Sequence, residues 1–260
     1  MQRLAFVTGA SSGIGLALAL RYHQAGYRLA LVARRTEEIK SWLEAYQISA
    51  ESYEIYSADV ANIDSIVAAG EACLCRQGVP DVVVANAGIS IGMDTAVRAD
   101  LDVLAQTLAT NVTGIAATFQ PFIEPMRRRG TGRLVGMASV AGIRGLPGHG
   151  AYCASKAAVI SYCESLRGEL RGTGLAVVTL SPGYVDTPLT RQNRYAMPFL
   201  MTPEAFAERA WRAIDAGVSY RVIPWQMGLV AKLLRLLPNP WFDRLLAGRP
   251  RKHRRPSGPG

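Results

Sequence analysis

The sequence contains few of the residues that stabilise or anchor proteins outside a reducing compartment. Four cysteines in 260 residues are too few and too irregularly spaced for a disulfide framework. Cys73 and Cys75 would point to different faces of a helix and no second ligand pair accompanies them, so we expect no metal site. No signal peptide precedes the first apolar run, Leu4–Thr8. We therefore expect a cytoplasmic protein.

Long hydrophobic runs are also absent. No uninterrupted apolar stretch reaches the ~20 residues that a membrane-spanning helix requires. We find no internal repeat of fixed period and no long low-complexity linker. Hydrophobic residues make up 49% of the chain and charged residues 19%, which is typical of a globular protein and excludes a largely disordered one. At this length we expect one large domain.

Acidic residues are outnumbered, but the excess of positive charge is concentrated at one end. The net charge is +9, from 29 basic and 20 acidic residues. Five of the cations lie within residues 249–260, at Arg249, Arg251, Lys252, Arg254 and Arg255. A nucleic-acid-binding domain would instead spread basic residues over a folded face with stacking aromatics, so we expect no nucleic-acid partner. Residues 249–260 are expected to form a basic, disordered tail.

Short β-branched runs alternate with longer amphipathic stretches along most of the chain. The expected strands are Leu4–Thr8, Leu29–Ala33, Tyr53–Ala58, Val82–Asn86, Leu134–Ala138 and Ala176–Ser181. The expected helices are Gly13–Gln24, Glu37–Tyr46, Ile63–Gln77, Asp100–Met126, Tyr152–Arg171 and Pro203–Ala216. Because the strands are apolar throughout and alternate with helices, the pattern predicts an α/β fold: a Rossmann-type, doubly wound parallel sheet covered on both faces.

A glycine-rich turn follows the first expected strand and opens the first helix. Its sequence is Thr8-Gly9-Ala10-Ser11-Ser12-Gly13-Ile14-Gly15. Gly9 permits the tight turn, Gly13 lets backbone N–H groups approach a pyrophosphate at the helix N-terminus, and Gly15 allows close packing of helix on strand. A glycine turn without a ligand is the alternative. We expect residues 1–224 to form a dinucleotide-binding domain.

Two arginines stand at the end of the second expected strand. A dinucleotide without a 2′-phosphate would meet an Asp or Glu there, but the chain has Ala33, Arg34 and Arg35. A guanidinium pairs with a phosphate through two parallel hydrogen bonds, so the position favours NADP(H), with NAD(H) as the second choice. The alternative is a pair of solvated cations at a strand end.

Tyr152 and Lys156 lie one helical turn apart, on one face of an expected helix. Free tyrosine, with a pKa of about 10, is a poor proton donor and acceptor near neutral pH. An ammonium at ~4 Å, at an effective dielectric of ~20, would stabilise the phenolate by roughly 4 kcal/mol, or about three pKa units. The pair therefore predicts a proton-transfer site, and a surface Tyr/Lys pair is the alternative.

Two further polar residues point to the same site. Ser139 follows the strand Leu134–Ala138 at the carboxyl edge of the sheet, where open α/β folds bind ligands, and its hydroxyl can orient a substrate carbonyl. Asn111 is a poor residue for the interior of a helix, and its amide can bind a water that links Lys156 to solvent. An Asn that faces solvent is the alternative.

These motifs resemble the short-chain dehydrogenase/reductase family, in the branch marked by T-G-x-x-x-G-x-G and Y-x-x-x-K, and the resemblance runs from about Leu4 to Thr187. It implies a catalytic set of Asn111, Ser139, Tyr152 and Lys156. Beyond the glycine turn it implies cofactor contacts from Arg34, Arg35, Asp59, Val60, Asn86, Ala87, Gly88, Tyr152, Lys156, Pro182, Gly183, Val185 and Thr187.

The resemblance also implies a reaction. A hydride passes between the nicotinamide and a carbonyl or secondary alcohol, Tyr152 acts as acid or base, and Lys156 lowers the pKa of the tyrosine and binds the nicotinamide ribose. The expected partners are a small carbonyl or alcohol substrate and further copies of the chain in a homodimer or homotetramer. The alternative from another class is a nucleotide-sensing or membrane-associated scaffold protein without turnover.

A second motif, Gly88-Ile89-Ser90-Ile91-Gly92, matches the G-x-S-x-G elbow of α/β-hydrolases. A hydrolase requires an acid and then a histidine downstream, and His149 has no clear acidic partner before it. We therefore interpret Ser90 as an ordinary loop residue. His149 is either a loop residue or a substrate contact.

Residues 225–248 are expected to form amphipathic helices. Leucines and a valine gather on one side of Leu229–Leu237, with Lys232 and Arg235 opposite them, and a second short apolar face follows the prolines at 238 and 240. This segment and the basic tail suit peripheral contact with an anionic membrane, at about 1 kcal/mol per cation near the surface. The alternatives are a cap over the substrate pocket and a subunit interface. Each of these readings makes a lipophilic substrate plausible.

Overall fold

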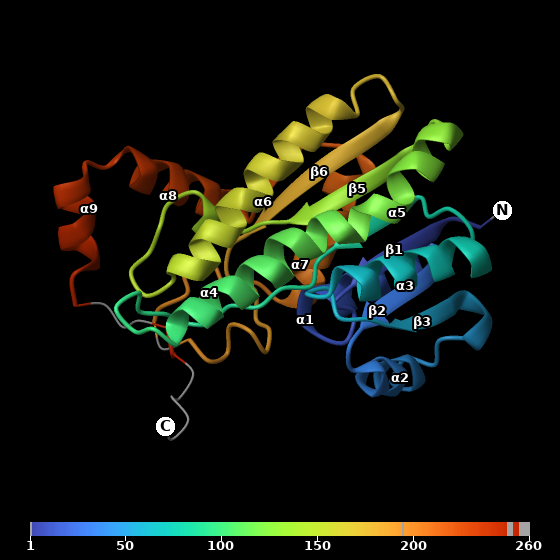
Figure 1. Ribbon diagram of the computed structural model, residues 1–260, viewed down its shortest axis with the longest axis horizontal. Coiled ribbons are helices and arrows are strands. Elements are labelled where there is room, and N and C mark those ends of the chain that lie inside the picture. The colour runs from blue at the N-terminus through green and yellow to red at the C-terminus, as the bar shows by residue number, and fades with distance from the viewer. Residues whose placement is uncertain (1, 194, 249–251, 255–260) are drawn as a thin grey trace.

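The computed structural model describes residues 2–193, 195–248 and 252–254. Seven strands form one parallel sheet in the order β3-β2-β1-β4-β5-β6-β7 (Figure 1). The strands are β1 (Leu4–Thr8), β2 (Arg28–Ala33), β3 (Tyr53–Ser57), β4 (Val82–Ala85), β5 (Gly132–Met137), β6 (Leu175–Pro182) and β7 (Tyr220–Ile223). The predicted Rossmann-type, doubly wound parallel sheet is therefore confirmed.

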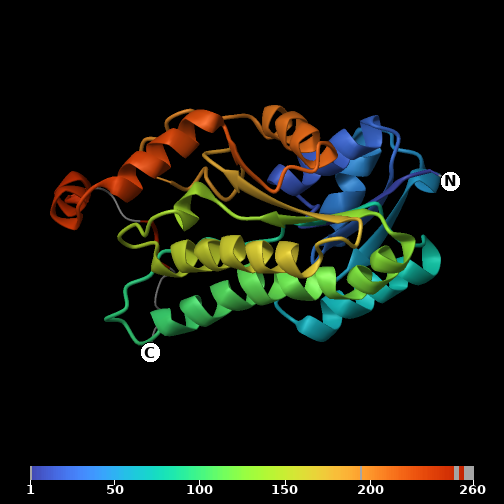
Figure 2. The same cartoon turned by 90° about the horizontal axis from the view of Figure 1, so that it is seen from above.

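Helices cover both faces of the sheet, as Figure 2 shows from above. One layer contains α1 (Gly13–Gln24), α2 (Thr36–Ala45) and α7 (Pro203–Asp215). The other contains α3 (Ile63–Arg76), α4 (Asp100–Leu108), α5 (Gly114–Arg129) and α6 (Gly150–Glu169). Consecutive strand side chains point to opposite faces, so Val7 joins the first core whereas Phe6 packs on Phe122 of α5 in the second, with 4.8 Å between ring centres. Both faces being buried explains the continuous apolar runs.

Two features of the sheet and its helices were not predicted. The edge strand β7 was missed because it has four residues and two of them, Tyr220 and Arg221, are exposed, so the apolar pattern is weak. The expected helix Asp100–Met126 is instead two helices joined by a π-helical turn, η2 (Ala109–Thr113). A π-helical turn changes the direction in which its side chains point relative to a continuous α-helix, and such turns are frequent at functional sites.

The expected C-terminal helices are α8 (Trp225–Leu236) and α9 (Asn239–Leu246), which lie at one end of the molecule (Figure 1). Helix α8 packs on the rest of the protein through the side that contains Met227, Gly228 and Ala231, which are buried. Its large apolar side chains Trp225, Leu229, Leu233 and Leu236 are exposed. Among the described residues, no helix is long and apolar enough to cross a membrane.

The expected disordered tail spans residues 249–260. Residues 249–251 and 255–260 of it lie outside the described residues. Lys252, His253 and Arg254 make defined contacts: the backbone of His253 accepts a hydrogen bond from Gly92 N–H (2.9 Å), and Arg254 pairs with Asp100. For these three residues the structure differs from the expectation, because the Arg254 guanidinium finds a nearly buried carboxylate on the folded body.

Candidate active site

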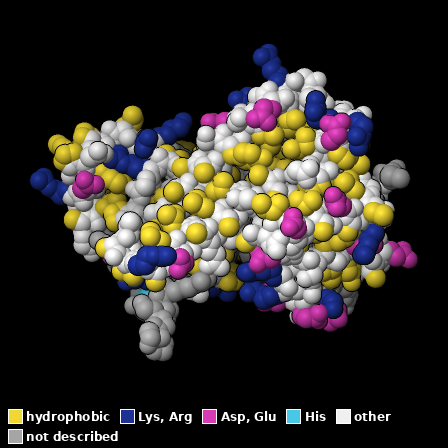
Figure 3. Space-filling model, viewed as in Figure 1, with side chains coloured by type: hydrophobic (Ala, Val, Ile, Leu, Met, Phe, Trp, Pro, Cys, Tyr) yellow, Lys and Arg dark blue, Asp and Glu magenta, His cyan; other side chains and the backbone are white. Residues whose placement is uncertain are grey.

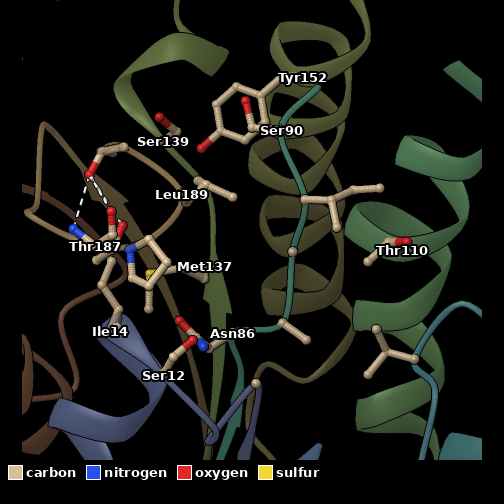
Figure 4. Close-up of a pocket in the computed structure, with 18 of the residues that line it drawn as sticks. Ser12, Ile14, Asn86, Ser90, Thr110, Met137, Ser139, Tyr152, Thr187 and Leu189 are labelled. Carbon is tan, nitrogen blue, oxygen red and sulfur yellow. Dashed lines mark hydrogen bonds between the residues drawn. The ribbon is translucent and has the colours of Figure 1, made fainter. Parts of the chain in front are cut away.

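A cleft of about 770 Å³ opens at the carboxyl ends of the parallel strands, where α/β sheets bind ligands. The turns after β1, β2, β3, β4, β5 and β6 all contribute side chains or backbone to it. Figure 4 shows one part of this cleft, with Ser12 and Asn86 at one end and Ser139 and Tyr152 at the other. The described part of the chain offers no group of three or more His, Cys, Asp or Glu side chains suited to a metal ion.

Most of the predicted cofactor contacts line this cleft. They are Gly9, Ser11, Ser12, Gly13, Ile14, Arg34, Arg35, Asp59, Val60, Asn86, Ala87, Gly88, Tyr152, Lys156, Pro182, Gly183, Val185 and Thr187. Gly15 does not line it. Instead, a Cβ at Gly15 would lie 2.1 Å from the Gly9 carbonyl oxygen, so this glycine lets the first turn of α1 pack against the turn that precedes it.

The glycine turn has a backbone shape that few other residues could adopt. Gly9 and Gly13 have φ values of +67° and +58°, in the left-handed region. A Cβ at Gly9 would lie 2.9 Å from the side-chain nitrogen of Asn86, and one at Gly13 would lie 3.1 Å from a methyl carbon of Thr187. The turn therefore leaves its backbone open to the cleft at the N-terminus of α1, which is the geometry that binds a pyrophosphate.

Thr8, the first residue of the sequence motif, joins the glycine turn to the loop after β4. Its hydroxyl oxygen accepts hydrogen bonds from the backbone N–H groups of Asn86 (3.0 Å) and Ala87 (3.1 Å). The side-chain amide of Asn86 donates to the Thr8 carbonyl (3.0 Å). Because β1 and β4 are neighbours in the sheet, these bonds fix the loop after β4 beside the glycine turn.

Arginines lie at the end of the cleft formed by β2. Arg34 approaches Asp59 at 3.7 Å, with 60% of its side chain exposed, and Arg35 pairs with Glu38 at 2.6 Å on the first turn of α2. Exposed pairs of this kind contribute little to stability, so both guanidinium groups remain available to an anion. No carboxylate follows β2 directly at the position where Arg34 stands.

Tyr152 and Lys156 both lie on α6 and both reach the cleft. The Lys156 ammonium donates a hydrogen bond to the Met137 carbonyl (2.7 Å) and lies 5.7 Å from the centre of the Tyr152 ring. Ser139 accepts a hydrogen bond from Ala141 N–H (3.2 Å), and it is close enough to the Tyr152 phenol to lower the pKa of that phenol. Figure 4 shows the Ser139 and Tyr152 side chains beside each other at one end of the cleft.

Burial controls the protonation of this pair. It lowers the pKa of Lys156 to about 8, because the ammonium is almost completely removed from water. Burial also raises the pKa of Tyr152, and the hydrogen bond from Ser139 offsets only part of this effect. The predicted lowering of the Tyr152 pKa by Lys156 is not found in this structure: burial raises this pKa, and the Lys156 ammonium is directed at the Met137 carbonyl.

Asn111 is completely buried in the π-helical turn η2 and does not line the cleft. Its amide nitrogen donates to the Ile89 carbonyl (2.9 Å) and to the Ser155 hydroxyl (2.9 Å), and its oxygen accepts from Ile89 N–H (2.8 Å). Both amide hydrogens are thus used within the protein, which argues against the predicted side-chain water relay. Asn111 instead clamps the loop after β4 to α6.

The loop after β6 forms the opposite wall. Thr187 is buried, and its N–H donates to the Thr190 hydroxyl (3.0 Å), a contact marked in Figure 4. The backbone of Gly183 donates to the Ile223 carbonyl (2.8 Å), which ties this wall to the strand β7 that was not predicted.

Several cleft residues were not predicted as site residues. They are Val32, Ala33, Ala58, Ile89, Ser90, Ile91, Thr110, Met137, Ala138, Pro188, Leu189, Thr190, Gln192, Lys252, His253 and Arg254. Ala138 was expected inside the strand Leu134–Ala138, but β5 ends at Met137, so Ala138 is the first residue of the turn that follows. For Lys252–Arg254 the sequence offers only a cluster of positive charge.

The hydrolase motif does not assemble a nucleophile and base in the described residues. Ser90 lines the cleft, whereas His149 is buried away from the cleft lining and bonds at 3.4 Å to the Tyr195 hydroxyl. Burial lowers the pKa of His149, and the positive charge of Lys252 lowers it further. His149 is therefore a buried loop residue near the site.

Comparisons with known proteins agree with this geometry. A model of the short chain dehydrogenase family matches residues 3–197. A Myxococcus xanthus protein named as an uncharacterized oxidoreductase is 39% identical over 241 residues, covering 93% of this chain and 95% of its own. The 2-(R)-hydroxypropyl-CoM dehydrogenase of Xanthobacter autotrophicus is 34% identical, covering 74% and 78%.

A solved structure shares the fold. The alcohol dehydrogenase of the archaeon Thermococcus sibiricus, complexed with 5-hydroxy-NADP, superposes with a TM-score of 0.76 at 26% identity, covering 86% of this chain and 96% of that one. The family match, the relatives and the cleft agree, and the chain belongs to the short-chain dehydrogenase family of oxidoreductases.

Proposed function

We propose that this protein is an NADP(H)-dependent oxidoreductase that reduces a carbonyl compound, or oxidises the corresponding secondary alcohol. One observation carries the proposal: Ser139, Tyr152 and Lys156 line the same cleft as the open glycine turn. The turn fits a dinucleotide, since Gly9 and residues 11–13 line the cleft at the N-terminus of α1 with backbone and small side chains. When bound, the nicotinamide supplies or accepts the hydride.

The protonation states favour reduction. A phenol whose pKa is raised stays protonated near neutral pH, so Tyr152 can donate its proton to a carbonyl oxygen that receives a hydride on carbon. Ser139 stands beside the phenol and can hold the same oxygen. Lys156, with a pKa of about 8, is still mostly protonated at neutral pH, and its ammonium would hold the nicotinamide ribose. Asn111 acts as a positioning residue through Ile89 and Ser155.

The test is the Tyr152→Phe variant. Its NADPH oxidation with a panel of ketones, aldehydes and 3-oxoacyl thioesters should fall by about 10²- to 10⁴-fold, because general acid catalysis is lost. NADPH binding, measured by fluorescence titration, should be unchanged. Ser90→Ala should retain turnover, whereas a hydrolase would lose it. Unaltered turnover by Tyr152→Phe would overturn the assignment of the acid.

We further propose that Arg34 selects NADP(H) over NAD(H). Its guanidinium lines the cleft at the end of β2, and its partner Asp59 is distant at 3.7 Å. Arg34→Ala should weaken NADPH binding roughly 10- to 100-fold, as expected for a hydrogen-bonded charge pair, and leave NADH binding nearly unchanged. Arg98→Ala, at an exposed arginine that does not line the cleft, is the control. Equal affinity of the wild type for both cofactors would contradict the proposal.

We also propose that α8 and α9 contact an anionic membrane surface. Trp225, Leu236 and Trp241 are 67%, 79% and 72% exposed. The exposed cations Lys232, Arg235 and Arg244 lie on the same helices, and Figure 3 shows hydrophobic and cationic side chains together at this end of the molecule. Such a mixture suits a lipid interface with negative headgroups better than a dry protein interface, whose centre is depleted of charge.

Vesicle co-sedimentation tests this contact. Wild type should bind phosphatidylglycerol vesicles and not phosphatidylcholine vesicles, and the double variant Leu233→Glu, Leu236→Glu should lose binding. Equal binding to both vesicle types, or none, would contradict the proposal. Sedimentation equilibrium of the same variants distinguishes membrane contact from a subunit interface. If the substitutions abolish a homodimer or homotetramer, this face binds a second copy of the chain. The cytoplasmic location stays a prediction.

A further inference from the structure

The segment Lys252–Arg254 forms a third wall of the cleft. Arg254 makes two hydrogen bonds to Asp100, at 2.5 and 3.2 Å, and the side chain of Asp100 is only 6% exposed. Asp100 itself is fixed by an N–H bond from Asp94 (2.6 Å). The backbone of Gly92 runs parallel to this segment, and a Cβ at Gly92 would lie 2.2 Å from the Lys252 carbonyl. The segment is therefore docked closely, against a position that only glycine can fill.

The segment lies at the substrate end of the cleft rather than at the dinucleotide end. Besides the Arg254–Asp100 pair, the segment is attached to the loop that carries Ser90 and Gly92 and to the loop that carries Leu189. Figure 4 shows Ser90 and Leu189 on the side of Tyr152 and Ser139, away from Ser12 and Asn86 of the pyrophosphate end. A molecule positioned by Tyr152 would thus extend toward Lys252.

Lys252 brings an uncompensated charge to this wall. Its ammonium donates to the Leu189 carbonyl (3.3 Å), and no salt bridge joins it to an acidic side chain of the described residues. Arg254, in contrast, is neutralised by Asp100. Partial burial lowers the pKa of Lys252, so the charge is held in a less hydrated environment, where its attraction for an anion is stronger than in water.

We propose that Lys252 binds a carboxylate or phosphate group of the substrate, and that the Arg254–Asp100 pair positions it. The inference rests on the proposed oxidoreductase function and adds a substrate class to it: carbonyl compounds that carry an anionic group. It places the determinant of that class in a segment outside the family motifs, which end near Thr187.

Matched substrates test this assignment. The ratio of kcat/KM for 4-oxopentanoate to kcat/KM for its methyl ester, and the corresponding ratio for dihydroxyacetone phosphate and dihydroxyacetone, should favour the charged member in the wild type. Lys252→Gln keeps a hydrogen-bond donor but removes the charge, and it should lower the ratio roughly 10- to 100-fold. Asp100→Asn should lower the ratio less. Lys232→Gln, a lysine on α8, is the control and should not change it.

The outcomes separate the two levels of the proposal. If no carbonyl compound is consumed by any variant, the oxidoreductase function fails. If the neutral ester is reduced but the ratio is the same in wild type and Lys252→Gln, the function stands and the role of Lys252 is refuted. If Lys252→Gln instead weakens NADPH binding in a fluorescence titration and leaves the ratio unchanged, Lys252 contacts a cofactor phosphate and the substrate assignment is overturned.

Discussion

The two ends of the cleft are held together by different means. At the dinucleotide end, backbone packs on backbone: a Cβ on Gly15 would lie 2.1 Å from the Gly9 carbonyl, and the Thr8 hydroxyl binds two N–H groups of the neighbouring loop. At the substrate end, a backbone contact between Gly92 and the segment Lys252–Arg254 is joined by side-chain contacts between residues far apart in sequence, such as Arg254 and Asp100. The first end tolerates little change, whereas at the second end single substitutions of the side chains, though not of Gly92, can change the chemistry.

The largest expected effect breaks the backbone-packed end. Gly15→Ala places a methyl group against a carbonyl oxygen that cannot move freely, and overpacking of this kind costs about 3 kcal/mol or more. Urea unfolding and NADPH titration should both show the loss. Gly168→Ala is the matched control: this exposed helical glycine of α6 has open space around it, so alanine should stabilise the protein by about 1 kcal/mol. Equal effects at the two positions would contradict the comparison.

The next effect concerns Lys156, which lies between the two ends. Because its pKa falls from 10.5 to about 8 on folding, the unfolded chain holds a proton between these pH values that the folded protein has released. The contribution of this group to stability therefore rises with pH across this window, by up to about 3 kcal/mol. Lys156→Met removes the titration and leaves other groups in place.

The measurement is the free energy of unfolding of wild type and Lys156→Met from pH 7 to pH 10.5. The free energy of unfolding of Lys156→Met minus that of wild type should fall by about 3 kcal/mol over that range. A difference that does not vary with pH would show that burial does not shift the pKa of Lys156.

A smaller effect is expected at Thr8. Thr8→Val keeps the shape of the side chain but leaves the N–H groups of Asn86 and Ala87 without their acceptor, at a cost of about 2 kcal/mol. Cofactor affinity should fall with stability, because the loop after β4 is released from the glycine turn. Thr131→Val, an exposed threonine before β5, is the control. Unchanged stability in Thr8→Val would mean that the loop is held by its other contacts.

The smallest effect on global stability is expected at Arg144, which holds the C-terminal helices. Its guanidinium donates to the carbonyls of Leu234 and Leu237, the latter at 2.7 Å, and lies 3.8 Å from the centre of the Phe242 ring. Arg144→Gln should lower the free energy of unfolding by about 1 kcal/mol. Hydrogen exchange should increase in α9 and not in β1. Uniform loss of protection would show that Arg144 supports the whole fold and not the C-terminal helices in particular.

The dinucleotide end of the cleft was predicted from the sequence and the substrate end was not, for a physical reason. Glycine encodes a backbone shape directly, so the turn at Gly9–Gly15 and its cleft were predicted from spacing alone. The role of Asn111 could not be predicted, because it depends on a π-helical turn that directs its amide to Ile89 and Ser155. The direction of the Tyr152 pKa shift was not predicted correctly, because sequence spacing places two side chains on one face of a helix but says nothing of their burial.

The ion pair between Asp100 and Arg254 joins residues separated by 154 positions, and its second member lies beyond residue 197, where the family match ends. An alignment restricted to residues 3–197 therefore leaves out the segment Lys252–Arg254 that lines the cleft. Two proteins identical at every motif position up to Thr187 can act on different compounds. A substrate should therefore be assigned from one such protein to another only after four positions have been compared together: the glycine at position 92, the acid at position 100 and the cations at positions 252 and 254.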